Sequence, residues 1–208
     1  MSILNSLASA LGERSDVPNQ ELAKKLVRSG NKTDIDEIAQ NLFNNDKKIQ
    51  SDCIKVLYEM GYLAPELIAG YVQDFLKLLS SKNNRLVWGG MIALSTIAAL
   101  KADEIYQQQD VILDAKEKGS VIATDASIIV LAKVAAAKPE YEARIIPVLL
   151  EHLRACRPKE VAQHSESSLV AINERNAAEF KVVLEKRMED LTPAQIRRVN
   201  KVLKKIEY

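Results

Sequence analysis

Hydrophobic residues recur along this chain with a period that is much longer than one helical turn. One apolar series has steps of 37, 37 and 38 residues and consists of Leu57, Leu94, Leu131 and Leu169. A second apolar series has a constant step of 37 residues and consists of Ile38, Phe75, Ile112 and Leu149. A fixed period of this size is typical of repeat proteins, in which each unit is one supersecondary motif. Two apolar series per unit indicate two helices per unit, each with one buried face.

Within each period, apolar residues recur at helical spacing, and turn-forming residues separate the segments. The expected helices cover residues 18–28, 33–43, 46–60, 65–79, 84–100, 102–118, 120–137, 140–154, 158–173, 177–191 and 193–206. Asp46 is suited to cap the helix that follows it. Thr192, Pro193 and Gln195 form a capping box with proline at the first helical position, which predicts a helix start.

The second helix of each period follows one residue pattern. It has a polar start, an aliphatic residue three positions later, a small residue near its middle, and an aliphatic end. The first copy consists of Asp46, Ile49, Cys53, Val56, Leu57 and Met60. Two later copies consist of Asn83, Leu86, Gly90, Ala93, Leu94 and Ile97, and of Ser120, Ala123, Ser127, Val130, Leu131 and Val134. A weaker fourth copy consists of Val161, Ser165, Ser168, Leu169 and Ile172. The pattern resembles HEAT repeats, and the resemblance covers residues 33–173.

This resemblance implies an all-α fold, a right-handed α-α superhelix of about five HEAT-like helix pairs with a terminal capping helix. We expect a single solenoid domain, in which residues 1–32 form an N-terminal segment and a first helix. Residues 33–176 form four HEAT-like repeats, and residues 177–208 form a C-terminal helical pair or cap. Many HEAT repeats carry an arginine that connects neighbouring units, and this chain has Gln50, Val87, Thr124 and Ala162 there. Packing between units is therefore expected to be mainly apolar. Tetratricopeptide repeats are the nearest alternative, but their period is about 34 residues.

The composition adds limits on location and partners. The 208 residues are 47% hydrophobic and 27% charged, and the formal net charge of +1 gives no argument for nucleic acid or membrane binding. No run approaches the roughly 18 apolar residues of a membrane span, and Met1–Leu11 lacks the basic start of a signal peptide. The two cysteines, Cys53 and Cys156, fall in different repeats, which argues against a disulfide framework. We therefore expect a cytoplasmic protein with no membrane partner.

The HEAT resemblance also implies that the second helices line the concave side of the solenoid. When their core positions face inward, the period of 3.6 residues places a second face of each helix on that side. The predicted partner-binding residues are Lys55, Arg85, Trp88, Ile92, Asp125, Ile129, Lys133 and His164. This surface is expected to be polar at its ends and apolar in its middle.

Trp88 is the most informative of these residues, because it is the single tryptophan and two glycines follow it. Inside a helix, Gly89 and Gly90 each cost about 1 kcal/mol relative to alanine, so another group is expected to approach this backbone closely. One interpretation is that a neighbouring helix packs on the glycines and Trp88 fills the remaining gap. The other is that the glycines leave a bare floor for a partner side chain beside an aromatic anchor.

Residues with catalytic or metal-binding potential are sparse. His152 and His164 fall on different predicted helices without a cluster of Cys, Asp or Glu at ligand spacing, so no metal site is expected. Cys53 takes a small-residue core position, which predicts a buried, inert thiol. Cys156 lies at a helix end, which is expected to raise its pKa although Arg154 and Arg157 flank it. We expect no catalytic residue, no cofactor and no enzymatic activity.

Three functions from different classes remain open. The leading hypothesis is a non-catalytic HEAT-repeat scaffold that binds a protein or peptide partner through its concave face. The alternative is nucleic-acid binding, including the activity of HEAT-like alkylpurine DNA glycosylases, which would need a basic, aromatic-lined groove with a catalytic carboxylate. A third is a role similar to that of HEAT-like bilin lyase subunits, for which no specific motif is present. The last helix has a basic face that suits either a solvated cap or the binding of nucleic acid or an acidic protein. This face consists of Arg197, Arg198, Lys201, Lys204 and Lys205.

Overall fold

The computed structural model describes residues 2–206, and within this range all regular secondary structure is helical. The chain divides into two compact units, Met1–Ser127 and Ile128–Tyr208, and each unit is described by itself. Among the described residues, no helix combines the length and the apolar character that crossing a membrane requires.

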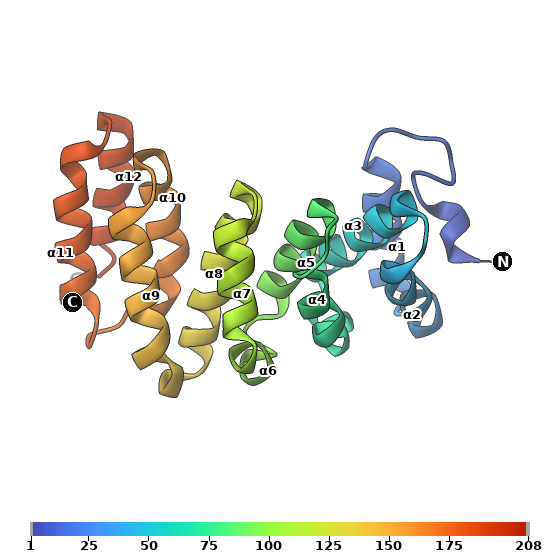
Figure 1. Ribbon diagram of the computed structural model, residues 1–208, viewed down its shortest axis with the longest axis horizontal. Coiled ribbons are helices and arrows are strands. Elements are labelled where there is room, and N and C mark those ends of the chain that lie inside the picture. Colours follow the sequence, from blue (N-terminus) through green and yellow to red (C-terminus); the bar gives the residue numbers. More distant parts are fainter. Residues whose placement is uncertain (1, 207–208) are drawn as a thin grey trace. The chain divides into compact units, whose positions relative to one another are not determined.

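The first unit begins with a short 3-10 helix, Ile3–Ser6, and its helices form two layers. Its α-helices are α1 (Val17–Ser29), α2 (Lys32–Gln40), α3 (Lys47–Leu63), α4 (Val72–Leu78), α5 (Asn84–Ile97), α6 (Ala102–Gln107) and α7 (Gln109–Lys118). Helix α3 packs between α1 and α5 in one layer, while α2 packs on α3 and α4 packs on α5 (Figure 1). This pairing of a first and a second helix agrees with the two apolar series of the sequence.

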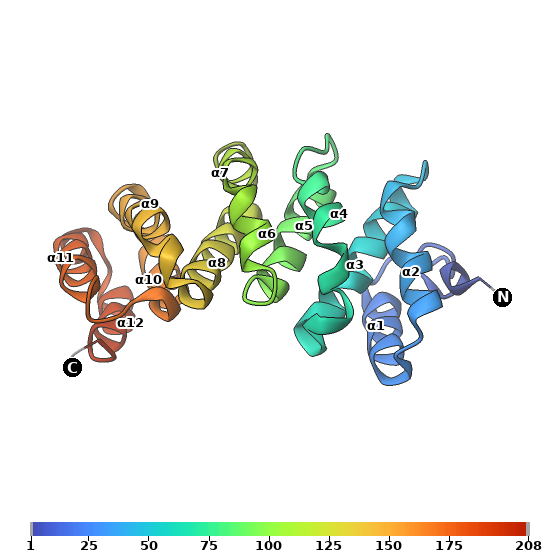
Figure 2. The same ribbon diagram turned by 90° about the horizontal axis from the view of Figure 1, so that it is seen from below.

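Helix α8 (Val121–Ala137) runs from the end of the first unit into the second. The second unit continues with α9 (Glu142–Ala155), α10 (Pro158–Ser168), α11 (Ala177–Arg187) and α12 (Pro193–Leu203). Here α9 contacts α11 and α10 contacts α12, so α9 and α11 lie along one side and α10 and α12 along the other (Figure 2).

The residues of the two apolar series are buried, with one exception. Ile38, Phe75 and Ile112 are 0% exposed and Leu149 is 1% exposed, so the second apolar series lies entirely in the core. In the first series, the fully or almost fully buried residues are Leu57, Leu94 and Leu131. Leu169 is only half-buried, because α10 ends at Ser168 and the following turn is a 3-10 helix. The fourth copy, which matches the sequence pattern only weakly, is thus also the copy whose α-helix ends before the leucine of the series.

Two predicted helix starts are confirmed by capping contacts. The side chain of Asp46 accepts a hydrogen bond from the backbone N–H of Lys48 at 2.7 Å, which satisfies one free donor at the start of α3. The predicted capping box at the start of α12 is also present, with reciprocal bonds between Thr192 and Gln195.

Two predicted helices are not continuous, and those predictions were wrong in this respect. Residues 65–79 begin as two 3-10 turns, Pro65–Leu67 and Ala69–Tyr71, and become α-helical only in α4. Ile68, between the two turns, has φ −111° and ψ −4° and is fully buried. Residues 102–118 are interrupted at Gln108, where φ is −110° and ψ is 24°, so α6 and α7 are separate helices.

Candidate partner-binding site

An aromatic cluster lies on the first unit where α3 packs against α5, and it consists of Tyr58, Tyr62 and Trp88. The ring centroid of Tyr58 is 6.1 Å from that of Trp88 and 6.2 Å from that of Tyr62. Tyr58 and Tyr62 are four residues apart, so they share one face of α3. Tyr58 is buried, Trp88 is half-buried, and Tyr62 is 62% exposed. The cluster therefore has a fixed base and an accessible edge.

Each helix also places a cation three residues before its central aromatic ring. The ammonium of Lys55 lies 4.8 Å from the centroid of Tyr58, and the guanidinium carbon of Arg85 lies 5.6 Å from that of Trp88. Both distances fall within the range in which a cation is attracted to the negative face of an aromatic ring. These contacts restrict the rotation of the rings and leave Tyr62 as the most exposed member of the cluster.

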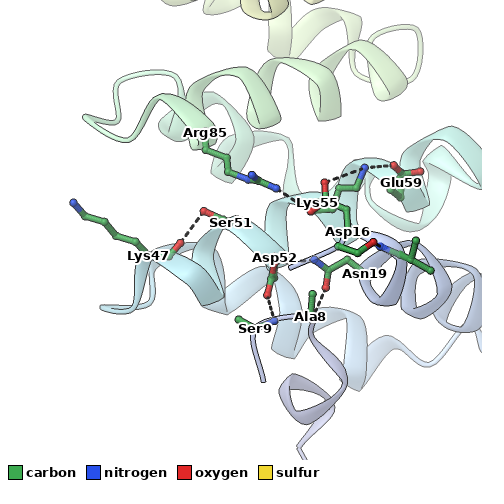
Figure 3. A network of polar contacts seen from close by, with 12 residues as sticks. Ala8, Ser9, Asp16, Asn19, Lys47, Ser51, Asp52, Lys55, Glu59 and Arg85 are labelled. Carbon is green, nitrogen blue, oxygen red and sulfur yellow. Dashed lines mark hydrogen bonds and ion pairs between the residues drawn. The ribbon is translucent and has the colours of Figure 1, made fainter. Parts of the chain in front are cut away.

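The same cations belong to an ion-pair network around Asp16, the residue before α1 (Figure 3). Asp16 lies 3.1 Å from an Arg85 guanidinium nitrogen and 3.9 Å from the Lys55 ammonium. Lys55 also donates a hydrogen bond to Glu59, one turn further along α3. Burial lowers the pKa of Lys55, but Glu59 and Tyr58 oppose that effect and leave the pKa above its ordinary value. Lys55 is thus held in its charged form by its own unit.

A second part of the network holds the N-terminal segment against α1 and α3. The Asp52 carboxylate accepts hydrogen bonds from the backbone N–H of Ser9 and from the side-chain amide of Asn19, both at 2.8 Å. The side-chain oxygen of Asn19 accepts a hydrogen bond from the backbone N–H of Ala8 at 2.9 Å. Asp52 and Asn19 are both buried, and Figure 3 shows them pointing toward each other from α3 and α1. Their role is therefore structural.

A hollow of ≈ 650 Å³ opens beside this network in the first unit. Its charged lining includes Glu13, Arg14, Asp16, Lys47, Lys48 and Arg85. Both acidic and basic groups line it, so it has no single sign of charge. Arg85 connects this hollow to the aromatic cluster, because it lines the hollow and also lies over the Trp88 ring.

The predicted binding residues divide between the two units. Arg85, Trp88, Ile92 and Asp125 are half-buried in the first unit. Ile129 and Lys133 are half-buried residues of the second unit. Their role in binding stays a prediction.

Two of the predicted residues do not lie on an accessible surface, and the expectation that they do was wrong. Lys55 is only 7% exposed, because its side chain packs along Tyr58 and its ammonium bonds to Glu59. His164 is 0% exposed, because its ring faces His152 of α9.

The two glycines after Trp88 are covered by neighbouring helices, which confirms the packing interpretation. A Cβ atom added to Gly89 would lie 2.8 Å from a side-chain carbon of Ile54 on α3. A Cβ atom added to Gly90 would lie 3.1 Å from both the carbonyl oxygen of Phe75 and the Cβ of Leu78 on α4. The glycines therefore allow α5 to approach α3 and α4 closely, and they do not form an open floor beside Trp88.

The tyrosines of the aromatic cluster were not among the sequence-based candidates. Tyr58 and Tyr62 lie three and seven residues after Lys55, which is the spacing of one helical face. That spacing, combined with the presence of Trp88 on the equivalent face of the second helix of the next repeat, is the signal that could have identified them.

The cysteines are both free thiols. Cys53 is buried as predicted, and burial, followed by the charges of Asp52 and Glu37, raises its pKa to about 12. The pKa of Cys156 is also raised, as predicted, but the first cause is burial, which outweighs the opposing effect of Arg187. Neither thiol has the depressed pKa of a reactive nucleophile.

The second unit contains a group of side chains that the sequence analysis did not connect. The Nε2 atom of His152 lies 2.8 Å from the Nδ1 atom of His164, and Cys156 lies beside both rings. The sequence analysis expected no cluster of ligand-type residues around the two histidines. That expectation was wrong, because the short connection between α9 and α10 brings both rings and Cys156 together. Imidazole and thiolate are ligands that transition metals prefer.

Comparisons with known proteins identify the fold. No protein-family model and no curated protein matches this chain. Among solved structures, a designed armadillo repeat protein in complex with the peptide (KR)4 is 13% identical, with a TM-score of 0.69 over 89% of this chain and 85% of that chain. A structure of computationally designed armadillo repeat proteins for modular peptide recognition is 13% identical, with a TM-score of 0.67 over 90% and 87%. An engineered protein is 17% identical, with a TM-score of 0.65 over 98% and 96%.

These likenesses cover most of both chains, although the sequence identities are low. The chain therefore has an all-α, armadillo/HEAT-like solenoid fold. This confirms the fold class that the 37-residue period predicts, while similarity at this level of identity does not transfer a ligand or an activity.

Proposed function

We propose that this protein is a non-catalytic interaction scaffold whose first unit binds a protein or peptide through the aromatic cluster of α3 and α5. The observation that carries the proposal is the arrangement of Tyr58, Tyr62 and Trp88, with a buried base and an exposed edge. Trp and Tyr are the residue types that most often dominate binding energy at protein interfaces. A cytoplasmic location belongs to the same proposal, since both cysteines are free thiols.

The rigidity of the cluster supports this function. Close packing at Gly89 fixes the backbone beside Trp88, and Arg85 lies over the Trp88 ring. A preorganised aromatic surface loses little side-chain entropy when a partner binds, so more of the contact energy contributes to affinity.

The local charges indicate which kind of contact would contribute most. Lys55 and Arg85 are already paired with carboxylates of the same unit, Glu59 and Asp16. A partner would gain little by charge alone, because it would have to compete with these pairs. We therefore expect an apolar or aromatic partner side chain to pack against Trp88 and Tyr62.

The fold supports a peptide as the partner class. One structural neighbour is a designed armadillo repeat protein in complex with a peptide, and another is described as designed for modular peptide recognition. Stacked helix pairs of this class present extended surfaces to their partners. For this chain, peptide binding is an inference from fold and surface together.

The proposal can be tested by selecting peptides from a random display library against the immobilised wild-type protein. The affinity of a selected, labelled peptide is then measured for wild type, Trp88→Ala and Arg197→Ala by fluorescence anisotropy. Trp88→Ala should weaken binding by about 2 kcal/mol or more, roughly 30-fold in Kd. Arg197→Ala changes an exposed residue of α12 and should leave the affinity unchanged.

Trp88 also provides an independent readout because it is the single tryptophan of the chain. Bound peptide should reduce quenching of its emission by acrylamide. Failure to select any peptide, or equal affinities for Trp88→Ala and Arg197→Ala, would refute the proposal. Binding of duplex DNA that is lost when Arg197, Arg198 and Lys201 are neutralised would instead favour the nucleic-acid alternative.

A further inference from the structure

His152, Cys156 and His164 form a compact group of potential metal ligands in the second unit. One ligand atom of each residue can be chosen so that all three lie within 4.8 Å of one another. His152 lies in the last turn of α9, and Cys156 is the C-terminal cap of that helix one turn later. His164 projects from α10, which is adjacent to α9 (Figure 1). The three donors thus come from two helices joined by one tight connection.

The two imidazole rings are arranged so that they share one proton. The 2.8 Å distance between Nε2 of His152 and Nδ1 of His164 is that of a hydrogen bond, and the ring centroids are 4.8 Å apart. One nitrogen must donate and the other must accept, so at least one ring is neutral. A neutral imidazole nitrogen is also the form that binds a metal. A cation between the rings would replace the shared proton, which passes to solvent. A neutral donor ring then carries its proton on its other nitrogen, and the acceptor ring needs no change of charge.

We propose that His152, Cys156 and His164 bind a divalent transition-metal ion of the zinc type. Two imidazoles and one thiolate form a donor set that Zn²⁺ favours over harder ions such as Mg²⁺ and Ca²⁺. On binding, the Cys156 thiol transfers its proton to solvent and coordinates as a thiolate. Zn²⁺ takes four ligands, and His152 and Cys156 are half-buried, which gives a water molecule or a partner side chain access to the fourth position.

The required rearrangement is small. Zinc bonds of about 2.0–2.3 Å in tetrahedral geometry place ligand atoms roughly 3.3–3.8 Å apart. The two imidazole nitrogens are closer than this at 2.8 Å, and the widest separation in the group is within 4.8 Å. Side-chain rotations that move each donor by about 1 Å bring all three into this range, so the backbone of α9 and α10 can stay in place.

Arg187 of α11 holds the cysteine-bearing end of α9 in position. Its guanidinium donates hydrogen bonds to the carbonyl oxygens of Leu153, Arg154 and Cys156, the last at 2.8 Å. It also lies 4.0 Å from the Cys156 sulfur, where a positive charge stabilises the thiolate. Asp190 lies 3.4 Å from the same guanidinium and offsets part of the positive charge that would otherwise repel a metal ion. A fixed outer shell of this kind is a common feature of metal sites.

The competing explanation is a histidine pair that only stabilises the fold. The two explanations differ in the role of Cys156, because a histidine pair does not need a thiolate. A metal site requires the sulfur as a ligand. A bound metal ion therefore gives a spectroscopic sign of thiolate coordination, which the histidine pair alone cannot produce.

The test is titration of the metal-free, full-length protein with Co²⁺, a spectroscopic substitute for Zn²⁺, followed by displacement with Zn²⁺. We expect one equivalent of Co²⁺ to produce visible d–d bands and a near-ultraviolet thiolate-to-cobalt band, both of which Zn²⁺ removes. Cys156→Ala should abolish the thiolate band and weaken Zn²⁺ binding at least about tenfold, and His152→Gln should weaken it similarly. Cys53→Ala is the matched control, because it removes the other thiol of the chain from the core of the first unit.

Circular dichroism of each variant establishes that it is folded before the titration is interpreted. His152→Gln provides a second test if Cys156→Ala unfolds, since His152 is half-buried and its replacement leaves Arg187 and the end of α9 unchanged. Absence of cobalt bands in the wild-type protein would overturn the proposal. So would a cobalt spectrum that is unchanged in Cys156→Ala or lost in Cys53→Ala.

Discussion

The Asp52 network of the first unit is centred on a buried carboxylate, whereas the histidine–cysteine group of the second unit brings together nitrogen and sulfur donors. In the first unit, Asp52 accepts bonds from Ser9 and Asn19, so both of its oxygens have partners. In the second unit, His152 and His164 share one hydrogen bond beside the Cys156 thiol. A carboxylate that accepts from amides completes a local structure, while adjacent imidazole and thiol groups retain a capacity to bind a metal.

The comparison also separates the two proposed activities. The aromatic cluster lies on the surface of the first unit and is held by packing and ion pairs of that unit. The histidine–cysteine group lies within the helix pair of the second unit and is held by Arg187. Variants in one unit should therefore leave the local chemistry of the other unchanged.

The largest effect is expected when the buried cation of the second unit is removed. Arg187→Met should lower the free energy of unfolding by about 2–4 kcal/mol, because the carbonyls at the end of α9 lose their donors in a buried environment. Urea denaturation followed by circular dichroism measures the change.

Arg175→Met is the matched control in the same unit. Arg175 is exposed and bonds to Glu142 at 2.9 Å, so its loss should cost about 1 kcal/mol or less. Equal costs for Arg187→Met and Arg175→Met would mean that Arg187 does not organise the interior of the second unit.

A smaller effect is expected from filling the close contact beneath the aromatic cluster of the first unit. Gly89→Ala places a methyl group 2.8 Å from Ile54, which is fully buried. Overpacking costs about 1–3 kcal/mol, and the higher helix propensity of alanine returns up to about 1 kcal/mol. We expect a net loss of about 1–2 kcal/mol in the free energy of unfolding, measured by urea denaturation.

Gly70→Ala serves as the control for this substitution. Gly70 has open space around its Cβ position and no positive φ, so alanine should be neutral or stabilise the fold by about 0.4–1 kcal/mol. A neutral result for Gly89→Ala would show that α5 can move away from α3, and the aromatic cluster would then lack its rigid support.

The sequence predicted the fold to a large extent because apolar periodicity and caps are local signals. The 37-residue step located both helices of the repeats, and the caps at Asp46 and Thr192 marked two helix starts. The same reasoning singled out Trp88 but left open whether it fills a packing gap or serves as an exposed anchor. It gave no information about Tyr58, because ring contacts between helices depend on the packing distance.

The errors concern two kinds of side chain. Some are long and flexible and turn away from the direction that their helical position suggests, and others contact a residue of a different helix. Helical position assigned Lys55 to a surface, but the long side chain turns onto Tyr58 and Glu59. His152 and His164 are 12 residues apart and meet because α9 ends at Ala155 and α10 begins at Pro158. In two helices joined by such a short connection, residues that are about equally far from it in sequence lie opposite each other. This rule could have identified the pair.

The smallest effect is expected from substituting two lysines, one in each unit, whose pKa values are shifted in opposite directions. Burial lowers the pKa of Lys133 in the second unit, whereas the pKa of Lys55 in the first unit is raised by Glu59 and Tyr58 against the effect of burial. A lowered pKa means that the folded state disfavours the charged form, so Lys133 opposes folding at neutral pH, and this opposition fades as the pH rises toward the ordinary lysine value. A raised pKa means that Lys55 contributes stability at pH values below its ordinary pKa of 10.5. This stability is lost as the pH rises through the folded-state pKa.

Lys133→Met should therefore stabilise the protein at about pH 7 by a few tenths of a kcal/mol, since the half-buried ammonium keeps part of its hydration, and the gain should shrink at about pH 10. Lys55→Met should destabilise it at about pH 7, and that loss should persist at about pH 10 because its pKa lies above the ordinary value. Urea denaturation of both variants and the wild type at the two pH values measures these differences, and a destabilised Lys133→Met at about pH 7 would contradict the contrast between the two units.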